Sequence, residues 1–490
     1  MKTCRNVLPT IKFTLVLLTI VGISFFHSVH AHTLKNREIK GIWQGTIKTP
    51  DFELRMIFVV SLSSDNTLTA TMDVPEQNAT DIPIDEVLFD GSTLQLEIKP
   101  IDGVYKGVLS DDGETIEGNW TQSGMTLPLV LERTEAKFEI KRPQEPKKPY
   151  PYKVEEVVFE NTRAGIKLAG TLTLPSHKRR CPAVLLLSGS GPQNRDELVF
   201  GHRPFLVLAD YLTRRGIAVL RVDDRGVGGS TGNFDGATAV DFVSDAMACI
   251  AFLKSRKEVD HEHIGLIGHS EGGMIAPMVA VQSSDATFIV MMASPGLAIV
   301  EMEYSEQARN LKARGASADL IAEMRIVQEN LFEVIRKETE SENVREKIDA
   351  LIRESIKKLC EEEREIIGIS EENLDVYIRE KVRRLDSPWF RYYLPYDPGT
   401  ALKKVTCPVL AINGEKDVNV LAKENLAAIE NALKSGGNTN YTVRELSDLN
   451  HLFQTAETGS ASEYGKIEET MSPAAMELIT DWILKQTESK

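Results

Sequence analysis

The sequence predicts an α/β protein with a mostly parallel sheet, preceded by a small all-β domain and interrupted by a helical insertion. Three observations lead to this prediction. Residues 32–133 consist of short apolar runs separated by turn signals. From residue 154 to residue 490, continuous apolar runs alternate with segments of helical spacing. Within that part, residues 296–396 break the alternation with a long charged segment of helical pattern.

Residues 1–31 differ from the rest of the chain. Lys2, Arg5 and Lys12 form a basic front, an apolar stretch follows from Phe13 to Phe26, and Val29-His30-Ala31 supplies a cleavage site. This is the pattern of a secretory signal peptide, because the apolar stretch is short for a membrane span. An uncleaved N-terminal anchor is the alternative. We expect export to the periplasm or the extracellular space.

The composition is that of an ordinary globular protein. The 490 residues are 42% hydrophobic and 26% charged, which suits about two or three domains. Cleavage after Ala31 would remove three positive charges and change the formal net charge from −15 to −18. So acidic a chain argues against nucleic acid and anionic membrane surfaces as partners. A small-molecule substrate is compatible with it.

Residues 32–133 have the turn density of a small antiparallel barrel or sandwich. Asp90-Gly91 and Asp102-Gly103 are among the turns. Trp43 near the start and Trp120 near the end lie in similar strand-like segments, which we expect to be neighbours in the sheet. Packing is the expected role of both tryptophans, with carbohydrate stacking as the alternative.

Residues 154–490 are expected to form the larger domain, after a semi-rigid proline-rich linker over 134–153. Ala183–Leu187 and Ile217–Val222 are continuous apolar runs, as in strands buried on both faces. Strand and helix patterns alternate after them, which indicates a parallel sheet covered by helices on both sides.

The insertion at 296–396 is expected to be a helical cap over the strand ends. Its apolar residues recur at helical spacing between charged ones. A coiled coil or an arm for a partner is the alternative. Four aromatic residues near its end either line a pocket or pack the cap onto the core: Phe390, Tyr392, Tyr393 and Tyr396.

An apolar run at 264–267 ends in Gly268-His269-Ser270-Glu271-Gly272, and a helix-like segment follows at once. G-x-S-x-G between a strand and a helix is the pattern of a nucleophile elbow. Its glycines avoid a collision across the tight turn, which presents the serine hydroxyl at the helix N-terminus. We predict Ser270 as a nucleophile and the amide of Glu271 as an oxyanion donor. The alternative is a glycine-rich turn with an exposed serine, and His269 is expected to serve packing.

A serine nucleophile needs a base, and His451 is the only histidine after Ser270. It lies in a loop just after a strand-like run, where an α/β sheet presents its active site. Asp417, in a turn after another buried run, is the expected acid that orients the histidine. Glu415 is its rival, and Asp448 is a substitute.

The second oxyanion donor is expected in the loop Ser188-Gly189-Ser190-Gly191-Pro192, directly after an apolar run. The main-chain N–H of Ser190 is our candidate, and Gly189 and Gly191 are alternatives one residue away.

No cofactor and no metal are expected. The glycines at 226, 228 and 229 complete neither G-x-G-x-x-G nor a phosphate-binding loop with its lysine. His261-Glu262-His263 precedes a strand and lacks the spacing of a zinc site.

Over residues 154–490 the chain resembles the α/β-hydrolase superfamily, in particular bacterial serine esterases related to the serine-aminopeptidase-type hydrolases. The resemblance rests on four motifs: Ser-Gly-Ser-Gly-Pro-Gln-x-Arg-Asp-Glu from residue 188, Asp-x-Arg-Gly-x-Gly-x-Ser from 223, Gly-His-Ser-Glu-Gly-Gly from 268, and Asn450-His451. Some of these hydrolases also carry an N-terminal β domain.

The resemblance implies a serine hydrolase that cleaves acyl esters, in which Ser270, Asp417 and His451 form the triad and the amides of Ser190 and Glu271 hold the oxyanion. A serine peptidase acting on short peptides is the alternative, because both reactions pass through an acyl-enzyme. A binding protein on a retired hydrolase fold is a third hypothesis, and it predicts a missing triad residue.

Overall fold

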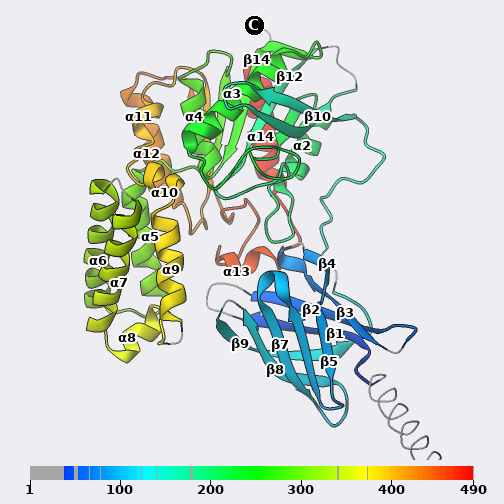
Figure 1. Cartoon of the computed structure of the whole chain (residues 1–490). Helices are drawn as coiled ribbons and strands as arrows, with labels where there is room; N and C mark the ends of the chain where they lie inside the picture. The colour runs from blue at the N-terminus through cyan, green and yellow to red at the C-terminus, as the bar shows by residue number, and fades with distance from the viewer. Residues whose placement is uncertain are drawn as a thin grey trace, which may run out of the picture. The chain divides into compact units, whose positions relative to one another are not determined.

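The computed structural model describes residues 38–488, apart from 49–52, 66, 78, 123, 139–140, 177–179, 339–340 and 372. The signal peptide predicted at 1–31 lies outside this part of the chain. The chain divides into two compact units, residues 1–139 and 140–490 (Figure 1). Within the described ranges, no helix combines the length and the apolarity needed to cross a membrane.

The first unit is an all-antiparallel half-barrel. Its described strands are β1 (Gly41–Lys48), β2 (Glu53–Leu62), β3 (Leu68–Val74), β4 (Ala79–Pro83), β5 (Glu86–Phe89), β6 (Thr93–Ile98), β7 (Gly103–Leu109), β8 (Thr115–Gln122) and β9 (Met125–Thr134). Their order in the sheet is β4-β3-β2-β1-β9-β8-β7-β6-β5.

The expectation that the two tryptophan strands are neighbours is wrong. β1, which carries Trp43, pairs with β9 and not with β8, which carries Trp120. The reason is the hairpin between β8 and β9, which brings β9 rather than β8 against the first strand. Both tryptophans are buried in the core of this unit, and Trp43 donates a hydrogen bond of 2.8 Å to the carbonyl of Ile39.

The second unit is built on a mixed sheet. Its described strands are β10 (Lys153–Asn161), β11 (Ile166–Leu174), β12 (Cys181–Leu187), β13 (Ala218–Val222), β14 (Val259–His269), β15 (Phe288–Met292), β16 (Val409–Gly414) and β17 (Tyr441–Leu446). Their order is β10-β11-β13-β12-β14-β15-β16-β17, in which only the pairs β10–β11 and β11–β13 are antiparallel. The α/β prediction with a mostly parallel sheet is therefore confirmed.

Helices cover both faces of this sheet, as Figure 1 shows. One apolar cluster joins the sheet to three helices, α3 (Ala239–Lys254), α4 (Glu271–Ala280) and α12 (Ala422–Ser435), and a second joins it to α2 (Pro204–Arg214) and α14 (Pro473–Thr487). Short helices lie at α11 (Gly399–Leu402) and α13 (Ala461–Tyr464). Helix α3 begins after Thr238 because Thr238 and Asp241 form a capping box there. In it the Thr238 N–H donates to the Asp241 carboxylate.

The register of the sheet brings three loops together at the carboxyl ends of its strands. Leu187 at the end of β12 pairs with Gly268 in β14, so the loop from Ser188 starts beside the elbow. Gly414 at the end of β16 pairs with Leu446 at the end of β17. Parallel strands thus place residues distant in sequence at one edge.

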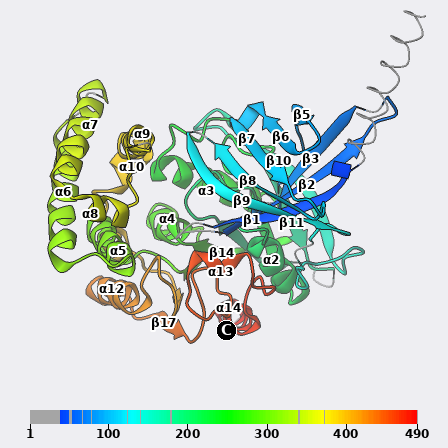
Figure 2. The same ribbon diagram turned by 90° about the horizontal axis from the view of Figure 1, so that it is seen from below.

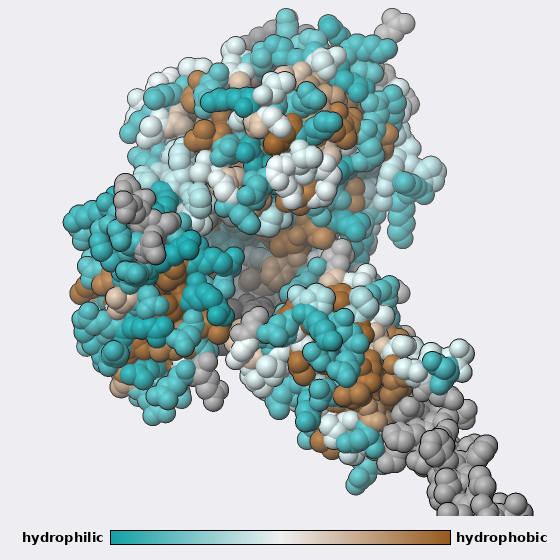
Figure 3. All heavy atoms as spheres, in the orientation of Figure 1, coloured by the Kyte–Doolittle hydropathy of each residue, from teal (hydrophilic) through white to brown (hydrophobic). Residues whose placement is uncertain are grey.

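The insertion between β15 and β16 is a helical bundle, which the structure describes as α5 (Ile299–Ala313), α6 (Ala318–Lys337), α7 (Ser341–Lys358), α8 (Glu361–Ile366), α9 (Leu374–Leu385) and α10 (Pro388–Tyr393). Figure 2 shows these helices gathered beside α4 and α12. They have an apolar core of their own, which includes Phe332, Ile348 and Phe390. Figure 3 shows mostly hydrophilic side chains on the visible face of this bundle.

The bundle contacts the loops that follow the sheet strands. Arg309 in α5 donates a hydrogen bond of 3.1 Å to the carbonyl of Val418, in the loop after β16. Tyr392, Tyr393 and Tyr396 pack against the main apolar cluster of the sheet. Of the two roles considered for these aromatic residues, the described contacts favour packing of the insertion onto the core.

Part of the proline-rich segment lies against the second unit. The Arg142 guanidinium donates to the carbonyls of Gly201 at 3.1 Å and Ile467 at 3.0 Å. The Gln144 amide donates to the carbonyl of Met471 at 2.7 Å. The segment is therefore anchored from Arg142 onward, and the boundary between the units falls just before it.

Candidate active site

Ser270 lies at the turn between β14 and α4 with φ 52° and ψ −117°. A non-glycine residue at positive φ is strained and marks a functional turn. Gly268 and Gly272, two residues to either side of the serine, leave no room for a side chain. A Cβ atom on Gly268 would lie 2.1 Å from the carbonyl oxygen of Gly272, and one on Gly272 would lie 2.1 Å from that of Leu187. The local geometry is that of a nucleophile elbow.

Asp417 and His451 are joined by a hydrogen bond of 2.8 Å between Oδ2 and Nδ1. The other carboxylate oxygen of Asp417 accepts from the amides of Asn419 at 2.8 Å and Val420 at 2.9 Å. Both residues are buried. The carboxylate is thus held in one orientation, with one oxygen aimed at the imidazole, as an orienting acid requires.

The rivals of Asp417 are engaged elsewhere. Asp448 forms an ion pair of 2.8 Å with Lys416. Oε2 of Glu415 accepts the amide of Asp448 at 3.3 Å. In the described part of the chain, neither carboxylate is bonded to His451.

The loop that carries His451 is shaped by its neighbour Asn450. Oδ1 of Asn450 accepts the amides of Leu452 at 3.0 Å and Gln454 at 2.9 Å. Ser270 Oγ and His451 Nε2 are not bonded to each other among the described contacts, and such contacts often tighten only when substrate binds.

The glycine-rich loop after β12 lies against the elbow, since a Cβ atom on Gly189 would sit 3.3 Å from that of Ser270. The amide of Gly189 already donates to Oε1 of Glu197 at 2.7 Å. Of the three candidate donors, Gly189 is therefore occupied, and Ser190 and Gly191 are left. The role of the Ser190 amide stays a prediction.

Glu197, the last residue of the motif from residue 188, and His269, which precedes the nucleophile, meet behind this loop. Oε1 of the buried Glu197 also contacts Nδ1 of His269 at 2.9 Å. Nε2 of His269 lies 2.9 Å from the carbonyl oxygen of His451. The view of His269 as a packing residue is therefore incomplete, because its ring bonds to two loops of the site.

Glu271, the residue after the nucleophile, has a buried carboxyl that contacts the insertion. Nε1 of Trp389 donates to it at 2.7 Å, and the Ser190 hydroxyl also bonds to it. Burial raises the pKa of Glu271, although both hydrogen bonds oppose the rise. Trp389 is a residue that the sequence gave no reason to select.

The motif from residue 223 is structural. Asp223 accepts from the amide and guanidinium of Arg195, including a contact of 2.7 Å to Nη2. Gly228 has φ +54°, and a Cβ atom there would lie 2.5 Å from Oδ2 of Asp223. The glycines thus let the chain turn around this carboxylate. Among the described residues, no group of three or more His, Cys, Asp or Glu side chains could hold a metal ion.

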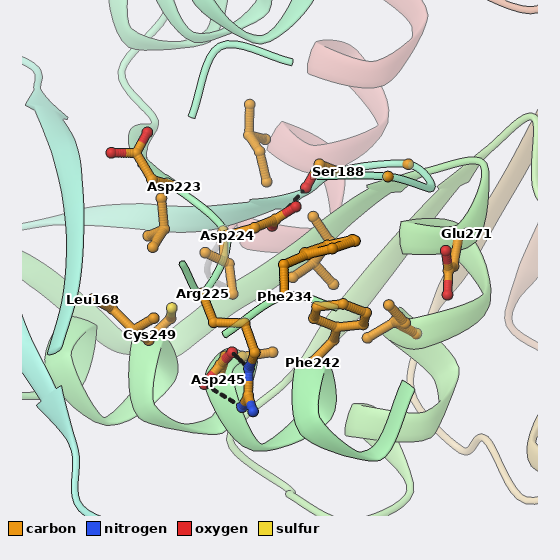
Figure 4. Close-up of a pocket in the computed structure, with 18 residues that line it drawn as sticks. Leu168, Ser188, Asp223, Asp224, Arg225, Phe234, Phe242, Asp245, Cys249 and Glu271 are labelled. Atoms are coloured by element: carbon orange, nitrogen blue, oxygen red, sulfur yellow. Dashed lines mark hydrogen bonds and ion pairs between the residues drawn. The ribbon is translucent and has the colours of Figure 1, made fainter. Parts of the chain in front are cut away.

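A small cavity of about 60 Å³, partly open to solvent, lies beside the glycine-rich loop. Its lining includes Gly189, Glu271, Phe234 and Phe242. In Figure 4 the two rings lie between the Arg225–Asp245 pair and Glu271.

Asp224 also lines this cavity, and its carboxylate accepts from the Ser188 hydroxyl and the Gln193 amide, both at 3.0 Å. Burial raises the pKa of Asp224 to about 7. The cavity therefore combines an aromatic wall with a carboxyl group that is largely protonated below neutral pH.

Comparisons with known proteins agree with this geometry. Residues 164–446 match the model of the X-Pro dipeptidyl-peptidase (S15) family. The chain is 26% identical over 319 residues to Esterase EstD of Thermotoga maritima, a match that covers 65% of this chain and 66% of that protein, just under two thirds of its length.

The comparison with solved structures gives matches that include the following two. Est1E of Butyrivibrio proteoclasticus, bound to ferulic acid, is 18% identical with a TM-score of 0.40, and the match covers 68% of this chain and 100% of that one. An esterase of Pyrococcus furiosus is 15% identical with a TM-score of 0.41, and the match covers 72% of this chain and 98% of that one.

The family match extends over more than half of the chain and includes the elbow and Asp417. The parallel sheet, the strained serine turn and the Asp417–His451 pair are the features expected of its fold. The chain therefore belongs to the X-Pro dipeptidyl-peptidase (S15) family, and its second unit has the α/β-hydrolase fold.

Proposed function

We propose that the chain is a serine hydrolase that cleaves carboxylic esters through an acyl-enzyme on Ser270. The observation that carries the proposal is the hydrogen bond of 2.8 Å between Asp417 and His451, at the strand edge that also carries the strained serine turn. The esterase relative supports an ester as the substrate.

In the first half of the reaction, Nε2 of His451 takes the proton of Ser270 while Oγ attacks the ester carbonyl. The amides of Ser190 and Glu271 donate hydrogen bonds to the oxyanion. The protonated His451 then gives its proton to the leaving alcohol. In the second half, His451 removes a proton from water, which attacks the acyl carbon. The bond to Ser270 Oγ then breaks, the acid leaves, and His451 returns the proton to the serine oxygen.

The cavity beside the glycine-rich loop is our candidate for the acyl subsite. It begins at Gly189 and Glu271, which adjoin the position of the oxyanion, and it is walled by Phe234 and Phe242. The two rings and the leucines of the lining suit a small aliphatic or aromatic acyl group, and the same cavity is also lined by charged residues that include Asp224, Arg225 and Asp245.

A peptidase is the second candidate, because the matched family is described as X-Pro dipeptidyl-peptidases. Amide and ester cleavage use the same triad, so the geometry at Ser270 is compatible with both. The two candidates differ in the leaving group that the site accepts.

A substrate panel tests the proposal. The protein is assayed with p-nitrophenyl esters of graded acyl length and, in parallel, with aminoacyl and X-Pro p-nitroanilides. We expect turnover of short esters and little release from the anilides, with Ser270→Ala as the control for background hydrolysis. Efficient anilide cleavage without ester cleavage would replace the esterase by the peptidase.

We also propose that the protein is exported by the segment 1–31. Its basic front, short apolar stretch and small residues at the cleavage position support this. The mass of the protein recovered from the periplasmic or extracellular fraction should correspond to a chain beginning at His32. A membrane-bound protein that keeps Met1 would support the anchor instead.

A further inference from the structure

Glu197 and His269 form a buried pair that contacts two loops of the site. A single oxygen of Glu197 accepts the Gly189 amide at 2.7 Å and faces Nδ1 of His269 at 2.9 Å. The opposite nitrogen of the same ring faces the main-chain oxygen of His451 at 2.9 Å. The chain of contacts therefore runs from the glycine-rich loop through one imidazole to the loop of the general base.

The partners determine the proton positions on the ring. A carbonyl oxygen can only accept, so Nε2 of His269 carries a proton. Nδ1 faces a carboxylate oxygen, which places a second proton there and makes the ring an imidazolium paired with Glu197. Burial alone lowers the pKa of His269, but Glu197 and the carbonyl of His451 outweigh it and raise the pKa.

The pair is also held rigidly. Glu197 adopts φ 53°, a strained conformation that persists only where surrounding contacts enforce it. The rings of His269 and His451 lie 4.9 Å apart between centroids. His269 immediately precedes the nucleophile Ser270. Its ring also bonds to the loop of His451 directly and to the glycine-rich loop through Glu197.

We propose that Glu197 and His269 are positioning residues that set the oxyanion loop and the His451 loop relative to Ser270. Neither residue touches the reacting atoms. Both act through main-chain groups, Glu197 through the amide of Gly189 and His269 through the carbonyl of His451. The proposal rests on the proposed hydrolase function, since its consequence is the alignment of that triad.

Two amide substitutions separate the contacts of the ring. His269→Gln can place its amide nitrogen near the position of Nε2, and so keeps the bond to His451 but loses Glu197. His269→Asn can place it near Nδ1, and so keeps Glu197 but loses the bond to His451. We expect kcat to fall about ten- to hundredfold in both variants, with KM changed less than about threefold, because misalignment of reacting groups lowers the rate more than binding.

The pH dependence of kcat/KM distinguishes a positioning role of the Glu197–His269 pair from a general loss of structure. The charged or titratable groups around His269 are Glu197, His451 and Asp417. In His269→Gln the Glu197 charge stays without its cation, which favours protonation of His451, so the acidic limb of kcat/KM should move to higher pH. In Glu197→Gln the buried His269 ring loses its counter-charge and its extra proton together, so the limb should stay at the pH of the unmodified enzyme while kcat falls.

His261→Gln is the matched control. His261 lies in the same strand, and its Nε2 also contacts a main-chain oxygen, that of Arg256 at 3.2 Å. It precedes the elbow and takes no part in the site. This control should keep kcat, KM and the pH profile of the unmodified enzyme.

Each rate is divided by the concentration of active sites. That concentration is the amount of enzyme labelled when the reaction with a fluorophosphonate has gone to completion, and it counts only folded enzyme. If His269→Gln does not fold, Glu197→Gln and His269→Asn are judged by the same measurements. Variants that behave like His261→Gln in kcat and in the acidic limb would overturn the positioning role. Full turnover by Ser270→Ala would instead overturn the proposed function, so the two failures are distinct.

Discussion

Nε1 of Trp389 in α10 donates a hydrogen bond of 2.7 Å to Oε1 of Glu271, the residue that follows Ser270. The helical insertion is thereby bonded to the first turn of the helix that carries the nucleophile. Since the Glu271 carboxyl is buried, its few polar partners determine where it lies.

Trp389→Phe should weaken this connection. The substitution keeps an aromatic ring but removes the donor, which leaves the buried carboxyl of Glu271 with one fewer partner. We expect the free energy of unfolding in urea to fall by about 1–3 kcal/mol, and kcat/KM to fall with it. Trp482→Phe in α14 is the control, because this buried ring packs against Phe288. Equal effects in the two variants would show that the bond to Glu271 has no special role.

Ser270→Ala should abolish both turnover and covalent labelling by a fluorophosphonate. The reason is that both reactions form a bond to the same hydroxyl oxygen. We expect kcat to fall by about 10⁴-fold or more while substrate still binds. Labelling that survives the substitution, located by mass spectrometry of the peptides, would assign the nucleophile to another residue.

Asp417→Asn should lower kcat by about 10³–10⁴-fold with a small change in KM, because an amide can no longer hold His451 in the tautomer that accepts a proton from serine. Steady-state kinetics on a short-chain ester measures the effect. Glu415→Gln is the control, since its carboxylate faces the amide of Asp448. The acid would have to be reassigned if the second variant were the more damaged one.

Asp224 should make stability depend on pH. Burial raises its pKa in the folded state to about 7, above the ordinary value of 3.8, so the folded state binds more protons than the unfolded state between these values. Stability contributed by this group is therefore present at low pH and decreases as pH rises through that window, by up to about 1.4 kcal/mol per pH unit.

Asp224→Asn removes that dependence, because an amide stays neutral at every pH. Relative to the unmodified protein, the variant should gain stability between pH 5 and pH 8, as measured by urea unfolding at both values. Asp235→Asn, in an exposed loop of the same segment, should show no such gain. Parallel pH profiles for Asp224→Asn and the unmodified protein would contradict the assignment.

The elbow could be predicted from the sequence because its determinants are local. Gly268, Ser270 and Gly272 lie between a buried strand and a helix, and both patterns are visible within a few residues. Asp417 and His451 are 34 residues apart. They could be selected because each follows a strand of a parallel sheet, and the ends of such strands meet at one edge.

The partners around this core could not be predicted in the same way. Glu197 and His269 are 72 residues apart, and Trp389 and Glu271 are 118 residues apart. None of them belongs to a spacing pattern that indicates its partner. For the same reason, Trp43 and Trp120 were expected in neighbouring strands, although β9 lies between them.

The sequence by itself determined the order of the elements, the helical insertion and the turn that carries Ser270, because periodicity and turn chemistry depend on residues close in the chain. The tertiary structure alone decided that Glu197 and His269 join the oxyanion loop to the His451 loop, and that Trp389 reaches Glu271. Such contacts arise only when several elements pack together, since the geometry of a side-chain hydrogen bond is set by the positions of whole strands and helices.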